Sequence, residues 1–383
     1  MRIAFVTETF PPEVNGVALT VERSVRHMRR AGHDVLLVRP RQSGEGGERS
    51  AAQCLTAGMR IPMYPQLRVG LATSGSLRRC LGRFGADLVH VATQGPLGHA
   101  ALAAASRLGL PVTSDFRTNF HVYCQHYGLG FARDWVVRYL RGFHNRAAAT
   151  FVPCRLLRNE LLAQGFERVE VLGRGVDSRL FSPQRRDDVL RLRWGAGRDN
   201  PVLLYVGRLA SEKNVPLALE AFAAVRARVP QARMVVVGDG PQLDTLRASH
   251  PNVHFAGLQR GEALAAHYAS ADVFVFPSLS ETFGNVTLEA MASGLCVVAF
   301  AAAAAGELVR HGRNGLLVPP GHRAAFVRTV CIAAHGRTDL GGLRQQARRT
   351  ALASDWEPVL QRFEARLCEL SSTMDVLGHA SLA

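Results

Sequence analysis

Lysine is almost absent from this sequence of 383 residues. Of its 46 basic residues, 45 are arginine, and Lys213 is the only lysine. An ammonium is a compact point charge that suits phosphate oxygens, whereas a guanidinium is a planar fork, so the two substitute poorly for one another in a tight anionic site. We therefore interpret Lys213 as a functional residue. The alternative is that a general drift toward arginine spared this position by chance.

Other absences exclude whole classes of protein. The seven cysteines are an odd number without C-x-x-C spacing, which argues against a disulfide framework and against a zinc site. No apolar run reaches the ~20 residues that span a bilayer, and residues 2–7 already form a strand-like segment where a signal peptide would have its apolar core. We therefore expect a cytoplasmic protein.

Positive charge is concentrated in the first half of the chain. Residues 1–183 contain 24 arginines against 13 acidic residues, whereas residues 184–383 contain 22 basic and 18 acidic residues. Such a basic half can face anionic lipid, nucleic acid or solvent. Nucleic acid is disfavoured because no recognisable binding motif is present. Segments 78–84 and 133–141 are candidates for peripheral docking on the inner face of a membrane.

Apolar strand-like runs alternate with helical stretches along the whole chain. The length and a hydrophobic content of 47% suit two domains, each with its own core. The alternation is typical of doubly wound parallel α/β sheets. Before the polar break at 180–188, the expected strands are 3–7, 35–39 and 88–92, with helices over 20–31 and 100–108. After it, the expected strands are 202–206, 234–237 and 273–276.

Two Rossmann-like domains follow from this pattern, with residues 1–182 in the first and 183–355 in the second. We expect ligands to bind in a cleft between them, at the carboxyl ends of the strands. Asn214 is the predicted N-cap of a helix that starts at Val215. Residues 356–383 resemble a closing amphipathic helix that packs back onto the first domain.

Residues 280–291 carry the second strong signal, since they follow the predicted strand 273–276. A glycine turn at Gly284 allows close backbone approach, and a helix starting near Asn285 directs its N–H groups at the sheet edge, which forms an anion site. Glu281 and Glu289 can accept hydrogen bonds from sugar and ribose hydroxyls. For either glutamate alone, an exposed surface charge is the more common explanation.

Three further loops follow predicted strands. Gly207 and Arg208 lie between the strand 202–206 and Lys213. Residues 9–17 connect the first strand and the first helix, where a diphosphate would meet backbone N–H groups. Residues 238–241 lack the third glycine of a dinucleotide fingerprint, and we interpret them as a tight turn near a nucleotide base.

Together these segments resemble family 4 glycosyltransferases of the GT-B fold, in particular the bacterial branch of phosphatidylinositol mannosyltransferases and diacylglycerol glycosyltransferases. The similarity extends from residues 8–17 to Trp356, and its most specific parts are the Glu281-x7-Glu289 pair and Gly207-Arg208 with Lys213. The resemblance implies two Rossmann-like domains facing across a cleft. It also implies a retaining hexosyltransferase with a lipid or glycan acceptor. GDP-mannose is the first choice of donor and UDP-glucose the second.

The resemblance implies roles for individual residues. Arg208 and Lys213 would bind the donor diphosphate, Glu289 the ribose and Glu281 the transferred sugar. Further donor contacts would come from Asn15, Gly16, Gly207, Gly238, Thr282, Phe283, Gly284, Asn285 and Val286. The nucleotide sugar is a substrate, and no cofactor is expected. Because the sequence has no Asp-x-Asp, we expect Arg208, Lys213 and the helix start near Asn285 to replace a metal ion.

Two segments depart from the family pattern. Arg117 occupies the position of a family histidine expected near the reacting sugar carbon. Either Arg117 takes over its electrostatic role, or His121 does so from one helical turn further on if this stretch is helical, or both only line the cleft. Residues 301–307 replace a Gly-rich, proline-containing loop, so the resemblance does not predict a ligand contact there.

Two other hypotheses use the same fold or the same residues. A nucleotide-sugar epimerase or a sugar-phosphate transferase would change the sugar or transfer its phosphate. A non-enzymatic protein would bind nucleotide sugars or polyanions, and replacing Lys213 or Glu281 would then affect no activity. The number of coinciding site features favours an enzyme.

Overall fold

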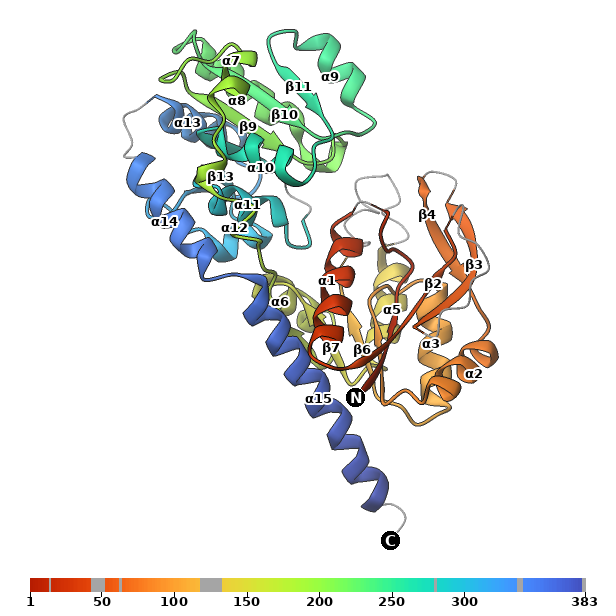
Figure 1. The fold of residues 1–383 in the computed structure, drawn as a ribbon. Helices are drawn as coiled ribbons and strands as arrows, with labels where there is room; N and C mark the ends of the chain where they lie inside the picture. Colours follow the sequence, from red (N-terminus) through yellow and green to blue (C-terminus); the bar gives the residue numbers. More distant parts are fainter. Residues whose placement is uncertain are drawn as a thin grey trace. The chain divides into compact units, whose positions relative to one another are not determined.

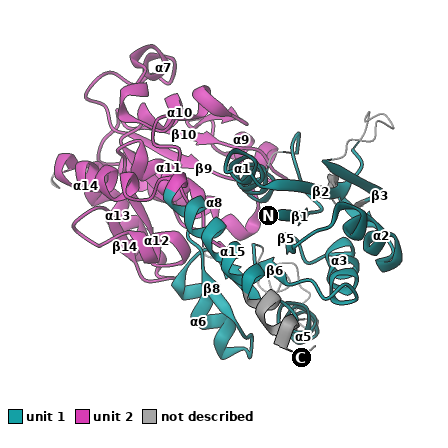
Figure 2. Cartoon of the chain, turned by 60° about the horizontal axis from the view of Figure 1, so that its bottom comes forward, with its two compact units in different colours: residues 1–121, 130–173, 358–383 teal, residues 122–129, 174–357 magenta. Residues whose placement is uncertain are grey.

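The computed structural model describes residues 1–13, 15–42, 52–61, 64–117, 133–278, 281–335 and 340–380. These residues form two compact units (Figure 2). The first unit contains the described residues up to Gly173 and those from Pro358 onward, and the second contains the described residues between Arg174 and Glu357. No described helix is both long and apolar enough to cross a membrane.

The first unit is built on an eight-stranded sheet in the order β4-β3-β2-β1-β5-β6-β7-β8. Its strands are β1 (Arg2–Val6), β2 (Asp34–Pro40), β3 (Gln53–Ile61), β4 (Tyr64–Leu71), β5 (Leu88–Val91), β6 (Val112–Asp115), β7 (Ala149–Val152) and β8 (Val169–Val171). Neighbouring strands are parallel except β3 and β4, which are antiparallel. The helices are α1 (Gly16–Arg30), α2 (Ser74–Phe84), α3 (Pro96–Ser106), α5 (Arg133–His144) and α6 (Arg155–Ala163), joined by α15 (Trp356–Ala380).

Helices cover both faces of this sheet (Figure 1). Successive side chains of a strand point to opposite faces, and β1 divides accordingly. Ala4 and Val6 pack with buried residues of α2 and α3, while Ile3 and Phe5 pack with α1 and with Phe363 of α15. The continuous apolar run of β1 is therefore explained by burial on two sides.

The second unit contains a six-stranded, fully parallel sheet in the order β11-β10-β9-β12-β13-β14. Its strands are β9 (Val202–Val206), β10 (Arg233–Val237), β11 (His254–Gly257), β12 (Val273–Phe276), β13 (Cys296–Phe300) and β14 (Leu316–Val318). The α-helices are α7 (Asp188–Arg193), α8 (Val215–Arg226), α9 (Leu243–Ser249), α10 (Gly261–Ala269), α11 (Asn285–Ala292), α12 (Ala303–Leu308), α13 (Arg323–Ala334) and α14 (Leu340–Leu352). A short 3₁₀ helix, η3 (Ser211–Lys213), precedes α8.

Both sheets reverse their strand order at one point. In the first sheet, β1 to β4 follow one another outward on one side, and β5 to β8 do so on the other. In the second sheet, β9 to β11 and β12 to β14 are arranged in the same way. Ligands of doubly wound sheets bind at the carboxyl ends of the strands beside such a reversal. The loops after β9 and β12 carry most of the donor-site candidates of the sequence analysis, so strand order brings these candidates to one edge.

The predicted doubly wound architecture is confirmed, with local corrections at helix starts. Strands 202–206 and 273–276 and the helix starts at Val215 and Asn285 have the predicted bounds. The first helix begins at Gly16 rather than near residue 20, because Asn15 caps it. Asn214 occupies the predicted N-cap position of α8, but its side chain makes no capping hydrogen bond. Asn214 has a left-handed backbone (φ +53°), and its Nδ2 donates to the carbonyl of Pro277 at 3.4 Å.

Candidate active site

Lys213 and Glu281 form an ion pair at the carboxyl edge of the second sheet. The Nζ of Lys213 lies 2.5 Å from Oε1 of Glu281, and the two side chains are only 12% and 16% exposed. Lys213 ends the 3₁₀ helix after β9, whereas Glu281 lies beyond the end of β12. The same carboxylate oxygen accepts a hydrogen bond from Ser278 Oγ at 2.9 Å. Two residues for which the sequence analysis predicted separate ligand groups are therefore direct partners.

Arg208 is the more exposed cation of this edge, with 39% of its side chain accessible. Its Nη1 lies 4.0 Å from Oε1 of Glu212, whose side chain is fully buried. The hydroxyl of Tyr205 donates to the carbonyl of Arg208 at 3.2 Å, which fixes the backbone there. Glu212 was missed by the sequence analysis, although its place beside the only lysine and four residues after Arg208 was a signal. Each of the two cations at this edge, Arg208 and Lys213, thus has a carboxylate beside it.

The loops after β9 and β10 pack backbone against backbone. Gly207 N donates to Val237 O at 3.0 Å, and Leu209 N donates to Asp239 O at 2.9 Å. A Cβ atom on Gly238, whose φ is +143°, would lie 1.9 Å from the carbonyl oxygen of Gly207. Close packing between the two loops therefore explains why Gly238 lacks a side chain. Its contact with a nucleotide stays a prediction.

The turn into α11 lies beside Glu281. Gly284 precedes the helix with a left-handed backbone (φ +86°), and a Cβ there would approach Cγ of Glu281 to 3.3 Å. The first N–H groups of a helix have no intrahelical acceptors, so this start presents donors near the ion pair. The turn and the first helical residues are the predicted donor contacts Thr282, Phe283, Gly284, Asn285 and Val286.

Glu289 lies one turn into α11 and is oriented by a buried tyrosine. The hydroxyl of Tyr268, on α10, donates to Oε2 of Glu289 at 3.0 Å. Burial, and then the charge of Glu289, raise the pKa of Tyr268 well above its usual value, so this hydroxyl stays protonated. An apolar-patterned aromatic residue of a helix is normally a core residue, which is why the sequence analysis missed Tyr268.

In the first unit, Asn15 caps α1. Its Oδ1 accepts from Ala18 N at 2.8 Å, and its Nδ2 donates to Thr9 Oγ1 at 2.7 Å. Thr9 Oγ1 in turn donates to the carboxylate of Glu13. Gly16 is the exposed first residue of α1. Asn15 thus has a structural role in organising this loop, and the predicted donor contacts of Asn15 and Gly16 stay predictions.

Arg117 follows β6 and is buried, with 8% of its surface exposed. Its Nε donates to Oδ2 of Asp115 at 2.5 Å, and Nη2 contacts the same oxygen. His121, the alternative to Arg117 in the sequence analysis, lies outside the described residues.

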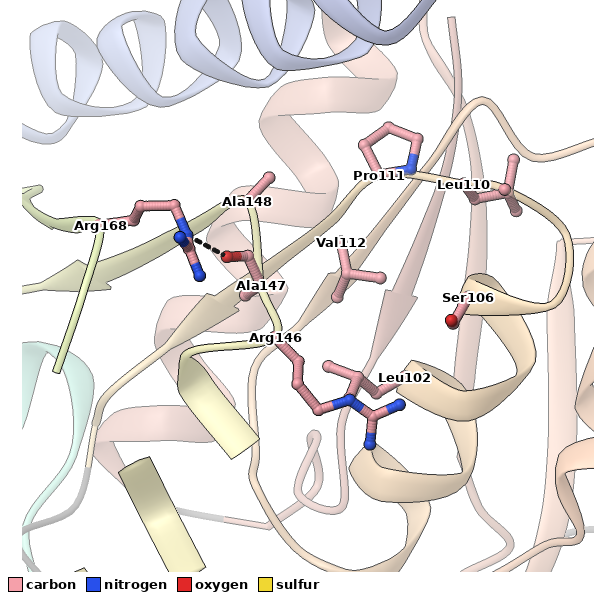
Figure 3. A pocket seen from close by; sticks show the side chains of 10 residues that line it. Leu102, Ser106, Leu110, Pro111, Val112, Arg146, Ala147, Ala148 and Arg168 are labelled. Atoms are coloured by element: carbon pink, nitrogen blue, oxygen red, sulfur yellow. Dashed lines mark hydrogen bonds between the residues drawn. The ribbon is translucent and has the colours of Figure 1, made fainter. Parts of the chain in front are cut away.

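A cavity of about 370 Å³ lies elsewhere in the first unit (Figure 3). It adjoins Val112, the first residue of β6, and Ala148, which directly precedes β7, so it lies at the amino ends of these strands. Arg168 closes one side, where its Nε donates to the carbonyl of Ala147 at 3.0 Å. No predicted site residue lines this cavity, so it is not a candidate for the active site.

Comparison with known proteins identifies the family. The model "Glycosyltransferase Family 4" matches residues 14–180, and "Glycosyl transferases group 1" matches residues 200–335. A GDP-mannose-dependent alpha-mannosyltransferase of Mycobacterium tuberculosis is 36% identical over 370 residues, which cover 94% of this chain and 94% of that protein. The chain belongs to glycosyltransferase family 4. The resemblance stated from the sequence is confirmed, and the protein is a glycosyltransferase.

Two further proteins resemble this glycosyltransferase. A GDP-mannose-dependent alpha-(1-6)-phosphatidylinositol monomannoside mannosyltransferase of Mycobacterium tuberculosis is 29% identical and covers 83% of this chain and 85% of its own length. Among solved structures, sucrose-phosphate synthase of Thermosynechococcus elongatus has a TM-score of 0.77 at 20% identity and covers 97% and 99% of the two chains. This structural likeness confirms the GT-B fold of the glycosyltransferase.

Proposed function

We propose that this glycosyltransferase transfers mannose from GDP-mannose to a lipid or glycan acceptor, with retention of configuration and without a metal ion. The donor assignment is carried by the 36% identity, over 94% of the chain, to a protein named as GDP-mannose-dependent. The name of a second relative specifies a phosphatidylinositol monomannoside, which supports a lipid acceptor. UDP-glucose is the alternative donor.

Charge develops on the departing diphosphate during the transfer, and catalysis requires that this charge be stabilised more in the transition state than in the bound substrate. Arg208, Lys213 and the N–H groups at the start of α11 supply donors at one sheet edge. An ammonium has three donors, so Lys213 can bond Glu281 and a phosphate oxygen at once. Glu281 then accepts from sugar hydroxyls while it orients the lysine.

No protein general base is assigned in this mechanism. The departing diphosphate lies on the face of the sugar from which the acceptor attacks in a retaining transfer, and it takes up the acceptor proton. Glu289 binds the ribose hydroxyls, and the protonated hydroxyl of Tyr268 restricts its carboxylate to one orientation.

The first unit offers a surface for docking on an anionic membrane. On α5, Trp135 is 65% exposed and stacks on Tyr139 with 5.7 Å between the ring centroids, and Arg138 is exposed beside them. Aromatic and arginine side chains on one helix are typical of interfacial binding. We expect the protein to sediment with phosphatidylglycerol vesicles at moderate salt and the Trp135→Ala variant to sediment less. Absence of co-sedimentation by the unchanged protein would exclude this role.

A thermal-shift screen of GDP-mannose, UDP-glucose and ADP-glucose tests the donor. A ligand at 100 times its dissociation constant stabilises the protein by about 2.7 kcal/mol, so we expect GDP-mannose to raise the melting temperature and the UDP and ADP sugars not to. Incubation with donor alone excludes an epimerase if the sugar stays unchanged. A shift produced only by UDP-glucose would overturn the donor assignment.

A further inference from the structure

A line of buried polar side chains runs along β6 of the first unit. Thr113, Asp115 and Arg117 are alternate residues, so the two strand residues point to one face, and Arg117 extends the row past the strand end. His90 of the neighbouring β5 pairs in register with Thr113. The exposed fractions are 0% for His90 and Thr113, 2% for Asp115 and 8% for Arg117.

Hydrogen bonds connect these four residues in sequence. The Nδ1 of His90 lies 3.0 Å from Thr113 Oγ1, and its Nε2 lies 3.0 Å from Asp115 Oδ2. Asp115 Oδ2 also accepts from Arg117 Nε at 2.5 Å. A carboxylate only accepts, so His90 donates from Nε2, and in a neutral ring Nδ1 then accepts from the threonine hydroxyl.

Aromatic rings confine the histidine of this chain. The rings of Phe5 and Phe363 pack against His90 with centroid distances of 5.1 and 5.0 Å. In such an apolar environment hydrogen bonds are strengthened, and the imidazole has little room to rotate. Phe5 of β1 and Phe363 of α15 thus hold His90 in place, and His90 in turn fixes the carboxylate of Asp115.

The guanidinium of Arg117 is only partly used by this network. Nε and Nη2 both contact Asp115, whereas Nη1 is buried without a hydrogen-bond acceptor among the residues that the structure describes. A buried charged donor without an acceptor is unfavourable. Arg117 lies two residues beyond the carboxyl end of β6, next to β5, which flanks the reversal of strand order. Substrates of doubly wound sheets bind at this edge.

We infer that Asp115 and His90 are positioning residues that orient Arg117 so that its Nη1 donates to an oxygen of a substrate at the carboxyl edge of the first sheet. Arg117, rather than His121, then takes the electrostatic role left open by the sequence. The inference rests on the proposed function, which supplies the kind of substrate that Arg117 would contact. The oxygen belongs to a sugar hydroxyl or a phosphate, of either the donor or the acceptor.

Kinetics of Arg117→Ala, Asp115→Asn and the double variant test this inference. We expect Arg117→Ala to lower kcat/KM by about 10²- to 10³-fold, as loss of one preorganised donor typically does. Asp115→Asn should lower it by at least about tenfold, and the double variant should be no worse than Arg117→Ala, since Asp115 acts through Arg117. Additive losses, or an unchanged Arg117→Ala enzyme, would contradict the inference.

Chemical rescue separates positioning from a merely structural effect. Millimolar guanidinium chloride should restore part of the activity of Arg117→Ala but little of that of the double variant, because Asp115 binds the added cation. His90→Gln, whose amide nitrogen can replace Nε2, should retain more activity than His90→Ala. Equal rescue of both Arg117 variants would overturn the positioning role.

Arg366→Ala is the matched control, because Arg366 lies in the same unit and also bonds one carboxylate through two nitrogens. Its Nε donates to Glu170 Oε2 at 2.9 Å, and its Nη2 donates to Oε1 at 2.6 Å. It should change neither kcat/KM nor the response to guanidinium, and thermal melting verifies the folding of every variant. The KM values for donor and acceptor, and donor hydrolysis without acceptor, show which substrate contacts Arg117. If the unchanged enzyme uses UDP-glucose instead of GDP-mannose, the donor proposal fails. The same variants are then compared with UDP-glucose as the donor, so the inference about Arg117 is tested separately.

Discussion

Lys213 and Glu281 constrain each other, because each is mostly buried and each compensates the charge of the other. Removing one partner of such a pair leaves an uncompensated charge, which destabilises a protein more than removing both. Lys213 and Ser278 both donate to the same oxygen of Glu281, Oε1, so an arginine at position 213 would have to share this acceptor with the serine hydroxyl. At this scale, the ion pair links the stability of the second unit to a lysine that the proposed function places in catalysis.

We expect Lys213→Ala to lower kcat/KM by about 10²- to 10³-fold and to destabilise the second unit by about 3 kcal/mol. The Lys213→Ala/Glu281→Ala double variant should be more stable than the sum of the single changes predicts. Lys213→Arg should retain stability but lose at least about tenfold in rate, since the planar fork fits a different geometry. Urea unfolding and steady-state kinetics measure both effects, and full activity of Lys213→Ala would contradict the assigned role.

Glu8 makes the first unit sensitive to pH. Burial raises the pKa of this carboxyl to about 7, against the opposing effect of hydrogen bonds from Leu97 and Gly70. Because the folded pKa lies above the unfolded value of 4.5, the folded state binds the proton more tightly. The stability contributed by Glu8 is therefore full below the unfolded pKa and is lost as the pH rises through 7.

Glu8→Gln should remove this loss, since glutamine resembles the protonated carboxyl and can still accept from Leu97 N. At about pH 8 we expect the variant to be more stable than the unchanged protein by at most about 3 kcal/mol, and therefore to melt at a higher temperature. At about pH 4.5 the two proteins should differ little. Melting curves across this range measure it. A difference independent of pH would show that the carboxyl does not titrate there.

At the scale of elements, backbone packing between the loops after β9 and β10 positions the residues that follow β9. The two loops exchange hydrogen bonds through Gly207, Val237, Leu209 and Asp239, and the contact requires the missing side chain at Gly238. The start of α11 depends similarly on the left-handed backbone of Gly284. Loop geometry, rather than helix composition, therefore determines which N–H groups are presented at this edge.

We expect Gly238→Ala to destabilise the protein by at least about 2 kcal/mol and to weaken donor binding, because its Cβ must displace the Gly207 carbonyl. Gly257→Ala is the control, since Gly257 has φ +67° but open space around its Cβ position. It should show only the backbone strain of about 1 kcal/mol. Chemical denaturation and donor titration compare the two variants, and equal effects would exclude a role for the loop contact.

At the scale of the whole molecule, the chain crosses between the two units more than once. Glu357 belongs to the second unit and Pro358 to the first, so α15 begins in one unit and continues in the other. Phe363 and Leu367 of this helix complete the core around β1. The end of the sequence thus stabilises the unit that contains its beginning.

Phe363→Ala should therefore destabilise the first unit selectively. We expect a loss of about 3–5 kcal/mol, as for other buried phenylalanines, with reduced hydrogen-exchange protection in β1 and β7 and unchanged protection in β9 and β12. Phe326→Ala, which removes a fully buried ring from α13, should show the opposite distribution. Loss of protection in both units with either variant would mean that the two unfold together.

Local patterns in the sequence were sufficient for the strands and several helix starts. The apolar runs 202–206 and 273–276 indicated buried parallel strands, and Gly284 followed by Asn285 indicated the start of α11, because these signals depend on neighbouring residues alone. The family motifs were equally local. By itself, the sequence thus determined the α/β class, the doubly wound rhythm and membership of family 4.

Only the tertiary structure decided which side chains meet. The pairing of Lys213 with Glu281, of Tyr268 with Glu289, and of His90 with Asp115 joins residues from different strands, helices or loops. Such pairs follow from strand order and register, which the periodicity of a single segment does not encode. The N-cap position of Asn214 was predicted correctly, but its side chain bonds the carbonyl of Pro277, which follows another strand, instead of capping α8.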